Sequence, residues 1–217
     1  MKDYEQIIRP LMCDERFAHS KAVAREAVRL AVLYGEDPDK AYTAGILHDI
    51  CKCMPSEVQL QWLQKSDIIL AETLRDYPKV WHAFAAGAYL ESELSITDSD
   101  ILNAVRYHTT ARAGMSLLEQ ITYLADLTSA DRTYPDVEEM RALVNRSLRD
   151  AMFAALDFIC GELRRKNALI CPFTYAACTE YGVCANGGNN HHDAKSNPND
   201  RSGAYSCSSA LLGSLHI

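Results

Sequence analysis

The sequence predicts an all-α protein folded as a compact helical bundle. Apolar residues recur at helical spacing from Asp3 to about Ala168, and no alternating strand pattern persists over several residues. Residue types typical of helix starts and ends divide this stretch into about eight or nine helices joined by short loops. Together these features favour helices packed on helices, with no sheet.

The first predicted helices have clear boundaries. Asp14 can cap a helix that runs to Gly35, because glycine adopts the left-handed conformation that often ends a helix. The pair Asp37–Pro38 starts the next helix, which carries the segment AYTAGILHDICK. Pro55 and Pro78 mark two further helix starts.

The second half of the bundle has similar signals. The pair Asp98–Ser99 can cap a helix that reaches His108. The pattern at Ser116–Glu119 is a capping box leading into LLEQITYLADL. An acidic variant at Asp136–Glu139 precedes one long amphipathic pattern that runs to about Arg165.

Length and composition predict one domain with an appendage. A chain of 217 residues suits a domain over residues 1–180, followed by a low-complexity tail over residues 181–217. The tail contains ANGGNNHHDAKSNPNDRSG, which has almost nothing to bury, so we expect it to be disordered.

Charge and hydropathy exclude several classes of partner. A net charge of -7 argues against nucleic-acid binding, which needs clustered Lys and Arg. No apolar run of about 18 residues predicts a membrane span. The N-terminus also lacks the apolar core of a signal peptide, so we expect a cytoplasmic protein without a membrane partner.

Four residues of the predicted helices can act as metal ligands. His48 shares a helical face with small residues at positions 41, 44 and 45, which let a neighbouring helix approach and bury His48 and Asp49. Adjacent helical residues point about 100° apart, so this pair can share a metal only near a helix end or in a concave pocket. Asp126 lies in an apolar stretch where an unpaired carboxylate is costly, and His19 lies one turn from apolar residues.

Imidazole and carboxylate ligands suit iron, manganese, zinc or cobalt better than calcium or magnesium. Such a metal lowers the pKa of bound water and polarises a phosphoryl oxygen, so hydrolysis is the chemistry it indicates. Four basic residues lie close in sequence to the proposed ligands and can hold phosphates, although each can equally be a solvated charge at a helix end. These are Lys52, Arg106, Arg112 and Arg132.

Several segments resemble the YqeK family, bacterial HD-domain hydrolases that split diadenosine tetraphosphate symmetrically into two ADP. The similar segments are RFAHS (16–20), AGILHDICK (44–52), HAFAAGAYL (82–90) and AVRYHTTARAGMSLLEQITYLAD (104–126), together with Arg132. The similarity covers most of residues 1–175. It implies an HD-domain bundle that uses metal-activated water and binds a dinucleoside polyphosphate and ADP. A homodimer is compatible with this resemblance.

The resemblance also implies roles for individual residues. It places one or two iron ions on the ligands His19, His48, Asp49 and Asp126. It gives catalytic roles to Asp49, Lys52, His82 and His108, the two last facing the polyphosphate or a second metal. It assigns nucleotide contacts to the Ala18 backbone, Lys52, His82, His108, Thr109, Arg132, Ile170, Cys171, Pro172, Phe173, Thr174 and Tyr175.

Two other functions remain open at this point. The same site can hydrolyse another nucleotide, such as a deoxynucleoside monophosphate or a cyclic dinucleotide. Alternatively, the chain is a non-catalytic helical nucleotide-binding module with a structural metal. A structural site is closed by protein ligands, whereas a catalytic site keeps a coordination position open for water or substrate.

Overall fold

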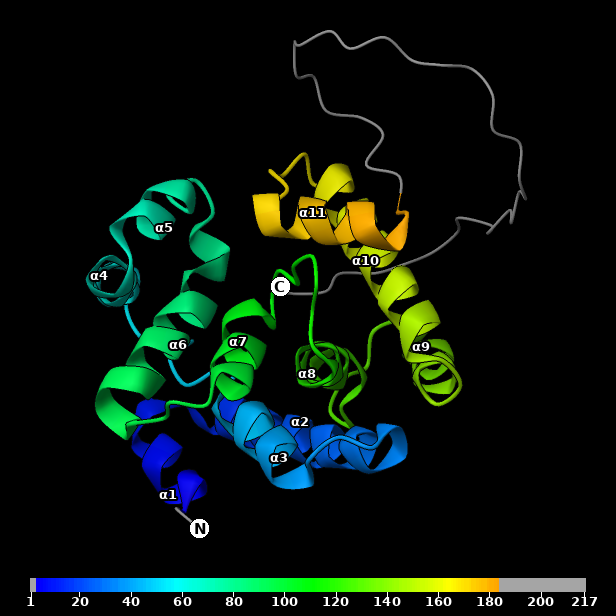
Figure 1. The fold of residues 1–217 in the computed structure, drawn as a ribbon, viewed down its shortest axis with the longest axis horizontal. Coiled ribbons are helices and arrows are strands. Elements are labelled where there is room, and N and C mark those ends of the chain that lie inside the picture. The colour runs from blue at the N-terminus through cyan, green and yellow to red at the C-terminus, as the bar shows by residue number, and fades with distance from the viewer. Residues whose placement is uncertain (1–2, 184–217) are drawn as a thin grey trace, which may run out of the picture.

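The structure is a computed structural model and describes residues 3–183 (Figure 1). Within that range every regular element is a helix, so the all-α prediction is confirmed. The α-helices are α1 (Tyr4–Ile8), α2 (Asp14–Tyr34), α3 (Pro38–Leu47), α4 (Ser56–Ser66), α5 (Ile68–Thr73), α6 (Trp81–Leu94), α7 (Ser99–Tyr107), α8 (Leu117–Thr128), α9 (Val137–Val144), α10 (Leu148–Arg165) and α11 (Pro172–Tyr181). Two short 3₁₀ helices are η1 (Arg9–Leu11) and η2 (Pro78–Val80). The tail expected to be disordered lies, from residue 184 onward, outside the described residues.

The described part contains more helices than the sequence predicted. Helices α1, α5 and α11 were not predicted, and the long pattern after Asp136 is two helices instead of one. The first of these helices ends at Val144, with Asn145 as its C-cap. The second begins at Leu148, and the Ser147 side chain caps it by accepting a hydrogen bond from the Asp150 amide. A serine that caps a helix stabilises a new start, which an amphipathic pattern alone does not reveal.

Most predicted boundaries agree with the structure. Gly35 ends α2 with φ 77°, and Asp37 caps α3 through hydrogen bonds from two amides of its first turn. Asp14 is the first residue of α2 and not its cap, because its carboxylate pairs with Arg9. The position of the cap was therefore predicted one residue late.

Helix α2 is the base of the bundle and packs along α3 and α8 (Figure 1). The approach to α3 is close because Gly45 lies against Ala24. A Cβ atom built on Gly45 would lie 2.8 Å from the Ala24 Cα atom. The small-residue face predicted around His48 therefore does bring two helices together.

Two groups of helices extend from the base on either side of α7 and α8. Helices α4, α5 and α6 lie on one side, and α9, α10 and α11 lie on the other (Figure 1). Contacts run from α4 to α6, from α6 to α7, from α7 to α8, and from α8 to α10. Helices α7 and α8 therefore form the centre of the bundle, above α2 and α3.

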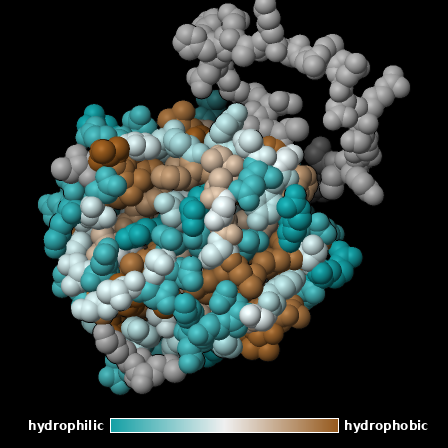
Figure 2. Space-filling view, in the orientation of Figure 1, coloured by the Kyte–Doolittle hydropathy of each residue, from teal (hydrophilic) through white to brown (hydrophobic). Residues whose placement is uncertain are grey.

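Polar and apolar side chains are mixed on the surface of the described residues. Figure 2 shows hydrophobic and hydrophilic surface interleaved on this face of the molecule. The large apolar side chains exposed in the described residues include Val32, Ile69 and Leu169, which belong to different parts of the fold. No helix of residues 3–183 has the length and apolar character needed to cross a membrane.

Candidate metal centre and nucleotide site

His48 and Asp49 lie at the end of α3, which stops at Leu47 and does not continue through the predicted AYTAGILHDICK segment. The last carbonyls of a helix lack partners within the helix. The His48 ring uses one of them, because its Nδ1–H donates to the Gly45 carbonyl at 2.7 Å. This bond directs Nε2 into the protein interior, and the turn after α3 brings the Asp49 carboxylate to the same space, 3.6 Å from that nitrogen.

His108 repeats this arrangement at the end of α7. Its Nδ1–H donates to the Val105 carbonyl at 2.7 Å, three residues earlier, just as His48 donates to Gly45. Its Nε2 lies 3.5 Å from Asp49 Oδ1, and its ring centroid lies 4.8 Å from that of His48. Two helix ends therefore present imidazole nitrogens to one buried carboxylate.

His19 comes from the middle of the base helix α2. Its Nε2 lies 3.0 Å from Asp126 Oδ1 on α8, and its Nδ1–H donates to Asp131 Oδ2 at 2.7 Å. Burial by itself lowers the pKa of His19, but the hydrogen bonds to the two carboxylates outweigh it and raise the pKa to about 9. Asp131 holds the ring in the way that a carboxylate commonly orients a metal-ligating histidine.

Arg132 lies beside these groups. Its guanidinium contacts the Asp126 carboxylate, and its Nε donates to the Asp126 carbonyl at 2.7 Å. The same guanidinium approaches His19 Nε2 at 3.5 Å. Arg132 is therefore anchored at the edge of the cluster through the residue predicted to be a metal ligand.

His82 on α6 completes the cluster from the opposite side. Its Nε2 lies 3.2 Å from Lys52 Nζ, 3.3 Å from Thr109 Oγ1 and 3.4 Å from Asp49 Oδ1. Burial lowers the pKa of His82 well below its ordinary value, so the ring is uncharged at neutral pH. Burial likewise lowers the pKa of Lys52.

The arrangement fits a divalent metal ion. Ligand atoms lie within 4.8 Å of one another in two sets that share His48, namely His19, His48 and Asp126, and His48, Asp49 and His108. Two polar atoms here, His48 Nε2 and Asp49 Oδ1, are buried without a hydrogen-bond partner. Such atoms are costly unless something coordinates them.

The electrostatics of His48 and Asp49 agree with this reading. Burial lowers the pKa of His48 to about 4, so its Nε2 lone pair is free at neutral pH. Burial alone would raise the pKa of Asp49, but His48 and the other neighbouring imidazoles lower it well below its usual value. A neutral imidazole beside an ionised carboxylate is the protonation state that metal binding requires.

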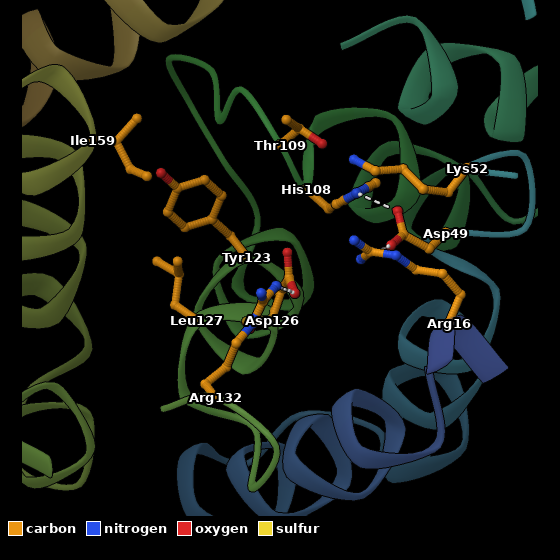
Figure 3. Close-up of a pocket in the computed structure, with 10 residues that line it drawn as sticks. All are labelled: Arg16, Asp49, Lys52, His108, Thr109, Tyr123, Asp126, Leu127, Arg132 and Ile159. Carbon is orange, nitrogen blue, oxygen red and sulfur yellow. Dashed lines mark hydrogen bonds and ion pairs between the residues drawn. The ribbon is translucent and has the colours of Figure 1, made fainter. Parts of the chain in front are cut away.

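A small cavity of about 40 Å³ opens beside the cluster (Figure 3). Its polar lining comprises Arg16, Asp49, Lys52, His108, Thr109, Asp126 and Arg132, and Tyr123, Leu127 and Ile159 close its other side. In the close-up Lys52 and Arg16 lie on one side of this space, and Ile159 lies on the other. Three cationic side chains therefore converge beside the carboxylates, as phosphate binding requires.

The predicted nucleotide segment is only partly brought together. Cys171 and Thr174 line a second cavity of about 370 Å³, which Thr109 also borders. Phe173 packs instead between Phe84 and Tyr107, with ring centroids 5.6 and 5.4 Å away. Of the remaining residues, Ile170 packs on the main core, Pro172 and Tyr175 are exposed, and Ala18 is exposed on α2.

Two of the four predicted phosphate-binding cations have structural partners. Arg112 donates to both oxygens of the buried Glu119 carboxylate, at 2.9 and 2.6 Å. The Ser116 hydroxyl caps α8 as predicted, but Glu119 serves this arginine and not the capping box. Arg106 lies 3.3 Å from Glu91. Of the four predicted cations, Lys52 and Arg132 line the cavity beside the cluster.

Sequence reasoning missed two residues of the site. Asp131 orients His19, and Arg16 donates from NH1 to Asp49 Oδ2 at 3.2 Å. Neither Arg16 nor Asp131 lies on an apolar helix face, so the sequence alone suggests that both are charged residues exposed to solvent. Arg16 is nevertheless one helical turn from His19, a spacing that could have indicated a shared face.

Comparisons with known proteins agree with this geometry. Residues 16–131 match the HD domain family. A symmetrical bis(5'-nucleosyl)-tetraphosphatase of Bacillus subtilis is 36% identical over 169 residues, 77% of this chain and 90% of that protein. A protein of the same name from Halalkalibacterium halodurans is 34% identical over 171 residues, 79% of this chain and 91% of that protein.

A solved structure has the same fold. The crystal structure of a "predicted HD superfamily hydrolase involved in NAD metabolism" from Clostridium acetobutylicum superposes with a TM-score of 0.80 and 30% identity. The match covers 83% of this chain and 97% of that one. Hydrolases with an HD domain bind divalent metals, and the His/Asp cluster described above can hold one. The chain therefore belongs to the HD domain family and, within it, to the YqeK group of symmetrical bis(5'-nucleosyl)-tetraphosphatases.

Proposed function

We propose that this chain is a metal-dependent hydrolase that splits diadenosine tetraphosphate symmetrically into two ADP. The observation that carries the proposal is the pair of buried atoms without a hydrogen-bond partner, His48 Nε2 and Asp49 Oδ1, beside a cavity lined by three cationic side chains. The names of the most similar relatives give the substrate class. The catalytic domain in this proposal spans residues 1–180.

The metal ligands in this proposal are His19, His48, Asp49 and Asp126. His108 also lies within coordination range of the cluster, so it can complete a first site or serve a second ion. The metal would supply Lewis acidity toward a phosphoryl oxygen and make a water molecule a stronger nucleophile. Iron is the identity we propose, with manganese, cobalt and zinc as the alternatives that this mixture of ligands also accepts.

The protein's own side chains bind and orient the polyphosphate. Lys52 and Arg132 supply positive charge on two sides of the cluster, and Thr109 offers a hydroxyl beside His82. His82 Nε2 lies within hydrogen-bond distance of both Lys52 Nζ and Thr109 Oγ1, which places these groups near one point beside Asp49. A phosphoryl group bound there would exchange these internal contacts for charge-assisted bonds to its oxygens.

The second cavity supports a nucleoside site. Its apolar lining includes Tyr77, Leu163 and Leu169, and it joins the predicted residues Cys171 and Thr174 to Thr109 at the cluster. A mainly apolar pocket with a few polar groups suits a nucleobase and ribose. The contacts proposed for Ala18, Ile170, Pro172, Phe173 and Tyr175, and the homodimer, remain predictions.

The two alternative functions differ from this proposal in measurable ways. The cavity beside the cluster favours catalysis over a purely structural metal, because it leaves space for a water molecule next to two of the proposed ligands, Asp49 and Asp126. A different nucleotide substrate keeps the same site. Since the similar Clostridium structure is described as involved in NAD metabolism, NAD belongs in the substrate panel.

Metal reconstitution tests the proposal. Chelator-treated protein should lose turnover of diadenosine tetraphosphate, and Fe²⁺ should restore it better than Mn²⁺, Co²⁺ or Zn²⁺. NAD, a deoxynucleoside monophosphate and a cyclic dinucleotide should be cleaved far more slowly. Full turnover by protein that contains no metal would contradict the mechanism, and preference for another nucleotide would reassign the substrate.

A further inference from the structure

Symmetrical cleavage of a dinucleotide requires binding surfaces for two ADP halves, and one nucleoside pocket provides only one of them. The scissile bond lies at the middle of the tetraphosphate, so an ADP half extends from the cluster in each of two directions. The 370 Å³ cavity, here called the apolar groove, runs along α10 and α11 and can hold one half. The other half needs a separate surface, a requirement that rests on the proposed function.

A third cavity lies on the α4 side of the cluster. It measures about 400 Å³ and is lined by Arg16, Lys52, Ser56, Gln59, His82 and the Pro78–Lys79 segment of η2. We call it the cationic groove, because three of these side chains are Lys or Arg and none is a carboxylate. Its volume falls within the range of roughly 300–1,000 Å³ that is usual for ligand pockets.

The two grooves meet at the cluster. Thr109 and Ile159 line both the apolar groove and the small central cavity. Arg16 and Lys52 line both the central cavity and the cationic groove. A chain of phosphates can therefore enter from one groove, cross the cluster and leave through the other.

The lining shows which end of the cationic groove faces the cluster. Arg16 and Lys52 form the inner end, because they also border the central cavity. Ser56, at the first turn of α4, and Lys79 do not border that cavity and form the outer end. Pro78 and Lys79 of η2 also line the apolar groove, so the two grooves adjoin at η2 as well as at the cluster. Lys79 is exposed and makes no ion pair with any described residue, so its charge is available to a ligand.

We infer that the cationic groove binds the second ADP half of the substrate, through its phosphates and ribose more than through its base. Arg16, Lys52 and Lys79 match the charge of two phosphates, whereas the groove lacks the apolar wall that the other groove offers to a base. The enzyme therefore selects the base of the nucleoside in the apolar groove and accepts different bases on the nucleoside in the cationic groove.

A blocking substitution tests this site. Ser56→Trp fills the outer end of the groove, and Ser66→Trp, an exposed serine at the opposite end of α4, is the matched control. The two substrates are diadenosine tetraphosphate and adenosine 5'-tetraphosphate, which has the same phosphates but a single nucleoside. Ser56→Trp should lower kcat/KM for the dinucleotide about a hundredfold, the lower end of the gain from a second linked contact. The single-nucleoside compound should be cleaved as by wild type, and the control should match wild type on both.

Calorimetry with ADP gives a second readout, independent of turnover. The wild-type holoenzyme should bind two ADP per chain, and Ser56→Trp should bind one. Equal kinetics of Ser56→Trp and wild type on the dinucleotide, or an equal loss on both substrates, would overturn the second-half site. Failure of wild type to cleave the dinucleotide at all would instead overturn the proposed function.

Discussion

At the scale of single residues, the site depends on how each imidazole is held. His48 and His108 donate from Nδ1 to a carbonyl three residues earlier, and His19 donates to the Asp131 carboxylate. In each case the other ring nitrogen is directed at the cluster. The ring orientation is therefore set before any ligand binds, which reduces the cost of forming a metal site.

The role of Asp131 gives the first prediction. Asp131→Asn should lower metal affinity by about 10–100-fold, because the carboxylate that orients His19 and raises its basicity is lost. Asp136→Asn is the control, since Asp136 is also exposed and asparagine tolerates its positive φ of 66°. Competition with a metal-binding dye measures the affinity. Equal affinities of both variants and wild type would remove Asp131 from the site.

Arg132 gives the second prediction. Arg132→Ala should retain the metal but lose about tenfold to a hundredfold in kcat/KM, because charge-assisted bonds to phosphate contribute roughly 1.5–3 kcal/mol each. Arg132→Lys should recover part of this loss, since it restores the charge without the bidentate geometry. Because the guanidinium contacts Asp126, metal content must be measured beside the kinetics. Loss of metal in the alanine variant would make Arg132 a structural partner of Asp126.

At the scale of helices, the approach of α2 and α3 positions the cluster. Gly45→Ala should destabilise the protein by about 1–3 kcal/mol, the usual range for an overpacked core. The new Cβ atom would lie 2.8 Å from the Ala24 backbone, which cannot move without displacing a helix. The shift should also weaken metal binding, because the Gly45 carbonyl holds the His48 ring.

Gly161→Ala is the matched control for that substitution. Gly161 lies inside α10, and a Cβ atom there would meet nothing within 4 Å. Alanine should therefore stabilise the protein by about 0.5–1 kcal/mol through its higher helix propensity. Urea denaturation measures both effects. A Gly45→Ala variant as stable as wild type would show that the helices adjust at little cost.

Some helices of the fold could be predicted from the sequence and others could not. Helices with strong N-caps, such as the one that starts at Asp37, were predicted with correct starts, although this helix ends at Leu47, before the end of the predicted segment. The short helices α1 and α5 were missed, because isolated short helices are unstable and form only when packing supports them. The break before Ser147 was missed because α9 and α10 both continue an amphipathic pattern.

For the whole molecule, the limits of prediction follow from how the site is assembled. The proposed ligands come from three segments that are distant in sequence, and each segment lies on or next to an apolar helix, so their burial could be expected. The grooves could not be expected in the same way. The apolar groove is enclosed by η2, α10 and the start of α11, and its shape exists only after these elements pack. Arg16 and Asp131 look like surface charges until the packing of the helices brings Arg16 to Asp49 and Asp131 to His19.

Product analysis of one reaction, with wild type and His48→Ala compared side by side, tests the central claim most directly. Diadenosine tetraphosphate is incubated with each protein, the nucleotides are separated by chromatography, and the metal content of each sample is measured. Wild type should yield ADP as the only nucleotide product, and His48→Ala should lose both metal and turnover because it lacks a direct ligand. AMP and ATP as products, or full turnover by the His48→Ala variant, would contradict symmetrical cleavage at this metal centre.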